Sequence, residues 1–581
     1  MMRRLLIALG LLVMIVGGLA FLVSQLVSPE DVKRRVAEQI SAWTGREVSL
    51  EGEAVITLLP RLSVKLKDVE IAGPAGDDAP FVQMAFLKAS VRLLPLLIGE
   101  VEIEDFTIVS PVISLRRAAD GAESWDFDTS AAALQLAFAG DVRLGSFVIQ
   151  DGRIVYSDEL SGRREIFSKV NLNLQWDSVR KPIEVSGRFV RHGEEMRITA
   201  SAQQPYRFIR AGETTLNLDV QAKSLNASFS GTVRDPRDPH LLGRLALNLE
   251  DAPKVLSWFS GRFAEASPFQ TIRLDSDADI AGNMATFSDA TLNLNGVSGK
   301  GALRLDFAGT PSVSGTLAFP SFDTTPVLHH LFRVEDGEAP KILKARLTTG
   351  WLDDFKADLR VSAGEVRVDA ARLQRVGASL LVQNGHALLT IGEAELYGGR
   401  LSGNITLDVD RGLPRLQTAL RAHELKTANL TSMLGIAPIE GTADIMVELA
   451  GSGEDIDAML QAVTGRLTVD AKNGRLPYLD LEAAAKAPSG EAQPLLNASA
   501  STPFTALKAA LTFANGQGEL TDSLVETSRY TVSLAGEIGL HNRRLALSGT
   551  LTPKTDQPAI PVEIIGKLAS PELTSSAPAS N

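Results

Sequence analysis

The sequence predicts a mainly β protein that follows one N-terminal transmembrane helix, with short helices between the strands. Two observations carry this prediction. Apolar and polar residues alternate along most of the 581-residue chain, as in Leu62–Lys67, and an uncharged apolar run covers Leu5–Val27. Because successive strand residues point to opposite faces, the alternation describes sheets that are apolar on one face and polar on the other. Such faces suit either a twisted antiparallel sheet or stacked β-sandwich modules.

Composition and charge exclude several classes of function. The net charge of −12 and the scattered basic residues argue against a nucleic-acid partner, because phosphate binding needs a basic stripe. The chain has no cysteine, which excludes disulfides, thiolate zinc sites and cysteine nucleophiles. Its length predicts several domains or one extended architecture.

Residues 5–27 form the expected single-pass membrane anchor. These 23 positions carry no charge and meet the roughly 20 residues that a helix needs to cross a bilayer. Arg3 and Arg4 precede them, so the positive-inside rule places residues 1–4 in the cytoplasm and exports the body. A cleaved signal peptide is the alternative, with small residues at Gly18–Ala20. Marker positions of the anchor are Leu5, Val13, Phe21 and Val27.

Residues 28–45 carry the signals of an amphipathic helix. Ser28 suits the N-cap, Pro29 the first helical position, and Gly45 the end. One apolar stripe is formed by residues at helical spacing, namely Val32, Val36, Ile40 and Trp43. Two placements fit this helix: on the membrane surface beside the anchor, or over the end of the first sheet.

Strand signals fill the rest of the chain, separated by turn residues and short helical patches. The clearest strands are expected at Val48–Leu50, Leu62–Leu66, Val101–Ile103, Ile154–Tyr156, Leu172–Trp176, Leu216–Val220, Leu245–Leu249, Leu292–Leu294, Leu303–Phe307, Val366–Val368, Ile405–Val409, Leu467–Val469, Leu511–Phe513 and Leu545–Leu547. Turns are expected at Asp120-Gly121, Asp151-Gly152 and Asn515-Gly516. Helical patches are expected at Pro253–Phe259, Pro326–Phe332, Leu430–Leu434 and Ile456–Val463. Residues 568–581 form a Ser/Ala/Pro tail that is expected to be flexible.

No set of residues converges on a catalytic mechanism. Only His329 and His330 are close among the histidines, and neighbours on a helix point about 100° apart, which suits metal chelation poorly. Gly296–Gly299 has the first half of a nucleophile elbow, but Lys300 stands where the last glycine is needed. The sequence therefore predicts no catalytic residue, no metal and no cofactor, and it predicts a protein that is not an enzyme.

Several short motifs occur in an order that resembles the AsmA family of Gram-negative envelope proteins. No single motif is specific, and residues 181–370 fit only by general texture. In the N-terminal part the matching residues are Thr44-Gly45-Arg46, Gly52, Pro60, Asp68-Val69, Gly99, Pro111, Asp120-Gly121 and Trp125, with Ser124 in place of the usual Asn. In the C-terminal part they are Leu396-Tyr397-Gly398-Gly399, Gly451, Gly453, Gly465, Asn473-Gly474, Thr502-Pro503-Phe504, Gly516, Gly536–Leu540 and Pro561–Gly566.

The resemblance implies a protein of the bacterial inner membrane with a periplasmic body that acts in outer-membrane biogenesis. It divides the body into an N-terminal β region over 46–180, a middle β-rich region over 181–370 and a C-terminal β region over 371–567. It also implies kinship with TamB and with bridge-like lipid transfer proteins, in which an elongated sheet folds lengthwise into an apolar groove that carries phospholipid.

Two readings of the apolar face remain open. In the first, it lines an open groove for phospholipid between the inner and outer membranes. In the second, it is the core of closed sandwiches in a non-catalytic scaffold or chaperone that binds outer-membrane or envelope assembly proteins. The residues expected to line a groove are Leu62, Val64, Leu66, Leu172, Leu174, Leu303, Leu305, Ile405, Leu407 and Val409.

Overall fold

The fold is taken from a computed structural model of the chain. It describes residues 29–57, 63–74, 79–91, 103–125, 145–178, 180–209, 212–235, 238–258, 267–333, 345–410, 412–434, 436–486, 493–494 and 496–575. The chain divides into two compact units, and each is described by itself. Unit 1 consists of Met1–Glu250 with Asp277–Gly282, and unit 2 of Asp251–Ser276 with Asn283–Asn581.

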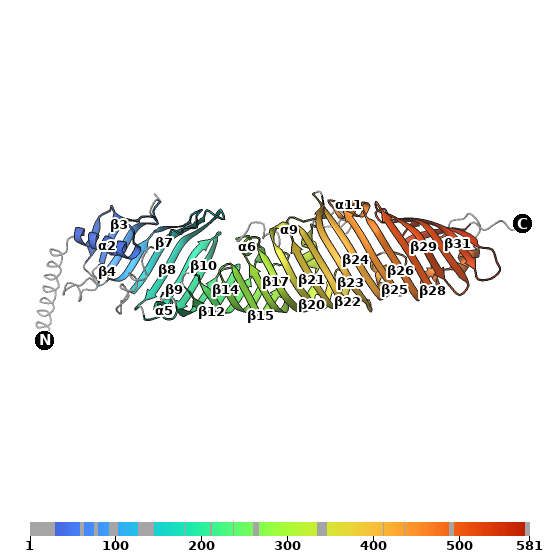
Figure 1. The fold of residues 1–581 in the computed structure, drawn as a ribbon, viewed down its shortest axis with the longest axis horizontal. Coiled ribbons are helices and arrows are strands. Elements are labelled where there is room, and N and C mark those ends of the chain that lie inside the picture. The colour runs from blue at the N-terminus through green and yellow to red at the C-terminus, as the bar shows by residue number, and fades with distance from the viewer. Residues whose placement is uncertain are drawn as a thin grey trace, which may run out of the picture. The chain divides into compact units, whose positions relative to one another are not determined.

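Unit 1 is built on one mixed, mostly antiparallel sheet (Figure 1). Its strands are β1 (Val48–Leu50), β2 (Ala54–Thr57), β3 (Ser63–Ile71), β4 (Val82–Val91), β5 (Ile103–Val109), β6 (Val112–Arg117), β7 (Gly145–Asp158), β8 (Arg163–Trp176), β9 (Ile183–Arg191), β10 (Glu194–Ala202), β11 (Glu213–Gln221), β12 (Leu225–Arg234) and β13 (His240–Leu249). From β7 to β13 each strand pairs antiparallel with the next in sequence. Strands β5 and β6 both pair with β7 in parallel. Strand β14 (Ile272–Ala281) is divided between the two units.

Unit 2 is a second ladder of paired strands. They are β15 (Met284–Leu294), β16 (Val297–Asp306), β17 (Ser312–Asp323), β18 (Phe332–Arg333), β19 (Arg346–Leu347), β20 (Lys356–Val368), β21 (Ala371–Gln383), β22 (His386–Leu396), β23 (Gly399–Asp410), β24 (Leu413–Lys426), β25 (Glu440–Ser452), β26 (Thr464–Leu479), β27 (Gln493–Pro494), β28 (Leu496–Ala514), β29 (Gln517–Glu526), β30 (Tyr530–Gly539), β31 (Arg544–Pro553), β32 (Ile560–Lys567) and β33 (Ser570–Ser575). The pairs from β20 to β26 are antiparallel, whereas β17 pairs with β20 in parallel. Strand β33 pairs with β32 and also with β27, which lies just before β28, so strands β28–β33 curl back on their own beginning.

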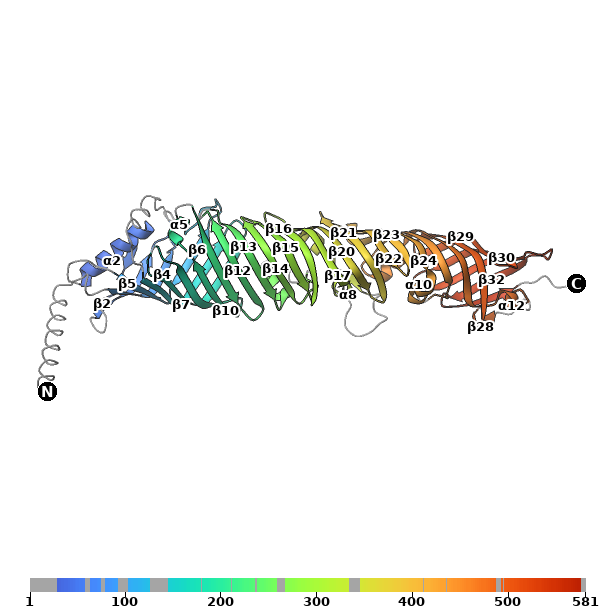
Figure 2. The ribbon, with the colours of Figure 1, turned by 90° about the horizontal axis from the view of Figure 1, so that it is seen from below.

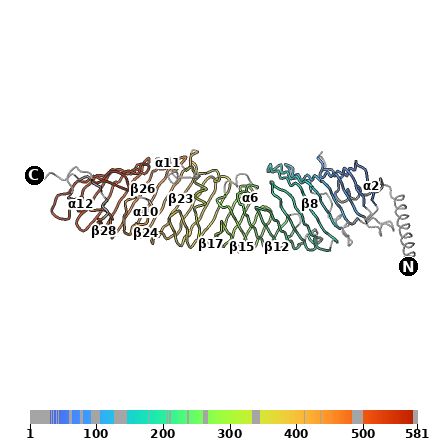
Figure 3. Tube along the Cα trace, turned by 180° about the vertical axis from the view of Figure 1, so that it is seen from behind, coloured from blue at the N-terminus to red at the C-terminus, as the bar shows by residue number. Residues whose placement is uncertain are grey.

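The helices in the described part of the chain are short. They are α2 (Pro29–Thr44), α5 (Pro205–Ile209), α6 (Ala252–Ser257), α8 (Thr325–Leu331), α9 (Trp351–Asp354), α10 (Thr427–Leu434), α11 (Ile456–Gln461) and α12 (Leu481–Lys486). Helix α2 and the four expected helical patches are confirmed, whereas α5, α9 and α12 were not expected. In unit 2, α9 and α11 lie along one margin of the sheet (Figure 1). Helix α10 lies along the other margin, as the view from below shows (Figure 2), and Figure 3 shows α10 and α11 from behind.

The membrane anchor expected over 5–27 lies outside the described residues, and so do its markers Leu5, Val13, Phe21 and Val27. Among the residues that the structure does describe, none of the helices combines the length and apolar character needed to cross a bilayer.

Most expected strands are confirmed, with three local differences. Leu62, Val101 and Glu102 lie outside the described residues, and β16 ends at Asp306 rather than Phe307. Part of the expected flexible tail is instead strand β33, because Ser570–Ser575 find backbone partners on β32 and β27.

The hairpin turn expected at Asp151-Gly152 is wrong, because this pair forms a bulge inside β7. Asp151 has a φ of 52°, and the register with β8 shifts on both sides of Gly152. Asp and Gly both tolerate the left-handed backbone that a turn or a bulge needs, so the dipeptide does not distinguish the two. Register shifts recur within the β21–β22, β22–β23 and β24–β25 pairs. Such bulges bend the strands and curve the sheet.

Candidate functional site on the apolar sheet faces

The register of unit 1 aligns apolar side chains into rows that run across the strands. One row consists of Phe147, Leu174, Val185, Ala200, Leu218, Phe229 and Leu245, each opposite the next. The adjacent row consists of Ile149, Leu172, Gly187, Ile198, Val220, Ala227 and Leu247. We call these two rows the unit 1 apolar face. The residues that alternate with these rows along the strands lie on the opposite face and are mostly polar. One such row, beside the first apolar row, consists of Gln175, Glu184, Ser201, Asn217, Ser230 and Arg244.

Most of the unit 1 apolar face is only half buried. Leu172 and Leu174, both expected groove residues, are half buried, as are Val185, Leu218 and Leu247. A second sheet packed on this face would bury it fully, as in a sandwich. The sheet therefore presents aliphatic side chains that retain contact with solvent.

The other end of the same sheet is closed by α2. Val64, Leu66 and Val69 on β3 are 4%, 2% and 1% exposed, and they form one core with Val36 of α2. Ile40 of α2 packs against this core as well. Of the two placements that the sequence allowed for this helix, the described part of α2 therefore covers the sheet. Val64 and Leu66 were expected to line a groove, but they lie in a closed core and do not belong to the open face.

Unit 2 has three comparable rows. The first is covered over strands β20 to β23, whereas the third is buried only at Leu317, which is 8% exposed. The first consists of Leu305, Val313, Ala357, Val382, Ala387, Leu407 and Leu416. The second consists of Leu303, Gly315, Leu359, Leu380, Leu389, Ile405 and Thr418. The third consists of Gly301, Leu317, Val361, Ala378, Ile391, Gly403 and Leu420. We call the second and third rows the unit 2 apolar face.

The structure thus brings together four of the expected residues of unit 2 in pairs. Leu305 and Leu407 share the first row, where Leu407 is 8% exposed. Leu303 and Ile405 share the second row, where both are half buried. Val409 lies near the end of β23, opposite Pro414, and is 45% exposed. Leu62 lies outside the described residues.

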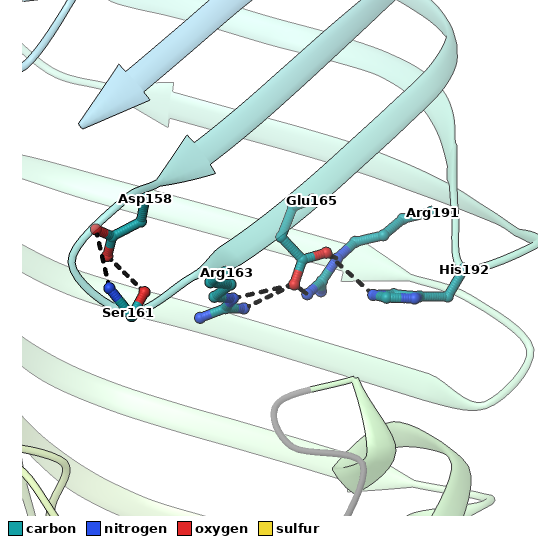
Figure 4. Close-up of polar contacts among 6 residues, drawn as sticks. All are labelled: Asp158, Ser161, Arg163, Glu165, Arg191 and His192. Atoms are coloured by element: carbon teal, nitrogen blue, oxygen red, sulfur yellow. Dashed lines mark hydrogen bonds and ion pairs between the residues drawn. The ribbon is translucent and has the colours of Figure 1, made fainter. Parts of the chain in front are cut away.

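A polar cluster fastens the hairpin ends of unit 1 (Figure 4). The Glu165 side chain is 7% exposed and accepts hydrogen bonds from Arg163 at 3.0 Å and 3.1 Å and from Arg191 at 3.1 Å. Nε2 of His192 lies 3.0 Å from the same carboxylate. Burial disfavours the charged form of Glu165, but the bonds from Arg191 and Arg163 outweigh it and lower the pKa below its usual value. This cluster joins β8 to β9, and its hydrogen bonds favour the charged form of the Glu165 carboxylate.

The motif Leu396-Tyr397-Gly398-Gly399 is explained by a tight turn. Tyr397 and Gly398 have φ values of 48° and 80°, the combination that a two-residue type I′ hairpin needs. A Cβ on Gly399 would come within 2.7 Å of the Leu425 backbone, so only glycine fits beside β24. The motif therefore forms the turn between β22 and β23 and allows β24 to approach closely.

The motif Thr44-Gly45-Arg46 joins α2 to the sheet. Gly45 has a φ of 67° and ends the helix, and Arg46 is 9% exposed. Arg46 donates a hydrogen bond to the Ser124 carbonyl at 2.5 Å and stacks over the Phe81 ring at 4.9 Å. These contacts hold the covering helix in place.

A charged cavity lies on the opposite, polar face of unit 2. A cavity of about 770 Å³ is lined there by charged side chains of both signs, including Arg421, His423, Asp444, Asp470 and Lys508. A backbone hydrogen bond from Glu424, supported by His423, lowers the pKa of Asp444. Within the described residues there is no cluster of three or more His, Asp or Glu side chains that could hold a metal ion.

In the described part of the chain, units 1 and 2 thus both present half-buried aliphatic rows on one face of a sheet. The sequence matches the model of the AsmA family over residues 2–310 and 335–523, so the chain belongs to the AsmA family. It is similar to "Protein AsmA" of Escherichia coli strain K12, with 23% identity over 479 residues that cover 79% of this chain and 72% of the relative. Members of the family are envelope proteins linked to outer-membrane biogenesis.

Proposed function

We propose that this chain carries phospholipid between the inner and outer membranes, with the acyl chains held against its apolar faces. The half-burial of rows that are continuous across neighbouring strands is the observation that carries this proposal. Membership of a family linked to outer-membrane biogenesis supports it. So does the expected anchor over 5–27, which would place the body in the periplasm.

The chemistry of the rows suits an acyl chain. A methylene group gains about 0.8 kcal/mol when it leaves water for an apolar surface, and this gain needs no directional bond. The row from Phe147 to Leu245 crosses seven strands and extends about 29 Å at ~4.8 Å per strand. A whole acyl chain can therefore lie along one row without meeting a polar side chain.

The test is to purify the full chain in a mild detergent and to identify bound lipid by mass spectrometry. Photo-crosslinking residues at Leu174 and Ile405 are expected to form adducts with acyl chains. The same residue at Ser186, on the polar face of β9, is the matched control and should form none. A lipid-free chain without adducts at Leu174 and Ile405 would overturn the proposal.

The second candidate is a non-catalytic scaffold for outer-membrane protein assembly. The charged cavity beside Arg421 and Asp470 favours it, because mixed charges on an open polar surface suit a protein partner. In that case, reversing charge at Arg421 should release co-purifying proteins while the lipid content stays the same.

A further inference from the structure

The connection between β17 and β20 crosses the sheet of unit 2. Thr324 leaves β17 and bonds to the Arg367 carbonyl near the end of β20, whereas Lys356 begins β20 beside the Pro311 carbonyl at the start of β17. The two strands are parallel, so the chain must return from one margin of the sheet to the other. We call the described residues of this connection, 324–333 and 345–355, the crossover.

The crossover lies on the apolar side of the sheet. Its residues Leu331, Phe332, Leu347, Trp351, Leu352 and Phe355 share one hydrophobic cluster with the first apolar row. Within that cluster Val382 is 0% exposed and Ala357 is 3% exposed. The neighbouring second row, two residues away on each strand, remains half buried. The boundary between covered and open surface therefore follows the crossover.

The two halves of the crossover are held very differently. Leu352 of α9 is 1% exposed and Leu347 of β19 is 8% exposed, so this half is anchored in the core. Helix α8 contains no buried residue, and its N-cap Thr324 makes no side-chain bond to the helix. Leu331 and Phe332 are half buried. β18 joins β19 over two residue pairs, and Thr348 donates hydrogen bonds from its backbone N–H and its hydroxyl to the Leu331 carbonyl.

We propose that Leu331 and Phe332 occupy part of the acyl-chain surface of unit 2, and that a bound acyl chain displaces them. This inference rests on the proposed function. Aliphatic and aromatic side chains of the crossover pack against one cluster that contains first-row residues and also Leu380 of the second row, where methylene groups would otherwise lie. Leu331 and Phe332 thus compete with the ligand and set how much chain unit 2 holds. Helix α8 lies within 311–334, between the two segments that match the family model.

The first test compares two variants that should change the apparent affinity for phospholipid in opposite directions. The full chain is titrated with vesicles of phosphatidylethanolamine and phosphatidylglycerol that carry a phospholipid with a fluorescent acyl chain. Leu331→Ala with Phe332→Ala should raise the apparent affinity by about ten-fold, because each extra methylene on an apolar surface is worth about a four-fold gain. Leu389→Ala, on the sheet, should lower it.

The second test fixes β18 in place. Arg333 and Arg346 face each other across β18 and β19, so a cysteine at each position is within disulfide distance. The natural chain has no cysteine, so this is the one disulfide that can form within a single chain. The oxidised R333C/R346C chain should bind the probe several-fold more weakly than the same chain after reduction, which is the matched control.

The outcomes separate the two proposals. If the natural chain binds no probe, the proposed function fails and this inference fails with it. If it binds the probe but L331A/F332A does not bind more tightly, and oxidation has no effect, only the inference is overturned. Thermal melts of each variant show whether unit 2 is folded. If L331A/F332A is unfolded, the comparison of the oxidised and reduced R333C/R346C chain decides whether Leu331 and Phe332 compete with the acyl chain.

Discussion

Two parts of unit 1 share one sequence pattern and differ in what lies above it. Strand β3 alternates apolar and polar residues beneath α2, and its Leu66 is 2% exposed. Strand β8 alternates in the same way, but Leu172 and Leu174 are half buried. The difference is the covering helix. Alternation makes one face of a strand apolar, and the cover decides whether that face becomes a core or a surface.

The comparison also separates stability from function. A side chain in the closed core beneath α2 contributes through full burial and close packing. A side chain on the open face buries less area, so it contributes less to stability and is available to a ligand. Paired substitutions in the two regions test this distinction directly.

The largest difference is expected from a buried charge. Val64 is 4% exposed, so Val64→Asp places a carboxylate in the closed core. It should lower the free energy of unfolding by roughly 3–5 kcal/mol. Leu174→Asp on the open face keeps its charge hydrated and should cost about 1 kcal/mol or less. Denaturant unfolding measures both. Equal losses would mean that the face at Leu174 is also closed.

Removal of side-chain volume gives the next largest difference. Leu66→Ala leaves a cavity in the closed core and should cost about 2–5 kcal/mol. Leu172→Ala removes a half-buried side chain and should cost about 1 kcal/mol, while it weakens acyl-chain binding. Thermal melts and lipid analysis of the same samples report the two effects. Unchanged lipid content in Leu172→Ala would contradict a role for this row.

The contribution of the Glu165 cluster to the stability of unit 1 depends on pH. Glu165 has a lowered pKa in the folded state, so its charge stabilises the fold above its unfolded pKa of about 4.3. This contribution is lost as the pH falls through the lower, folded pKa. Glu165→Gln should cost about 1–2 kcal/mol at pH 7 and should remove that part of the acid dependence. An unaltered acid profile in Glu165→Gln would show that other carboxylates govern it.

A similarly small effect is expected from loosening the packing of α2 on the sheet. Val36 is 9% exposed in the core beneath α2, and Val36→Ala should cost about 1–2 kcal/mol. The same change should raise the binding of a hydrophobic dye, because it uncovers apolar surface on β3. Leu172→Ala is the matched control, since its face is already open. A stable variant without added dye binding would show that α2 stays closed through its other contacts.

Sequence reasoning succeeded where the signal is local. The alternation around Leu172 and Leu305 identified strands and the correct apolar face, and the cap and spacing of 28–45 identified α2. It failed at Asp151-Gly152, since a turn and a bulge both use left-handed backbone. It also failed at 570–575, where pairing with β27 and β32 orders a segment that has little apolar character.

The candidate site was predictable only in part. The sequence indicated which residues share an apolar face, and the structure places Leu303 with Ile405 and Leu305 with Leu407 in common rows. It did not indicate that Val64 and Leu407 are covered. No signal in either strand reveals the cover, because it comes from α2 in one case and from the crossover in the other.

The sequence by itself determined that the chain is mainly β, where most strands lie and which side of each strand is apolar. A period of two is a local property, so neighbouring residues are enough to reveal it. Only the tertiary structure decided which stretches of that face are covered. Burial depends on contacts between distant segments, such as Val36 over Val69, Leu352 over Val382, and Leu573 beside Leu551. The open rows between these covers are therefore a property of the fold and not of any single strand.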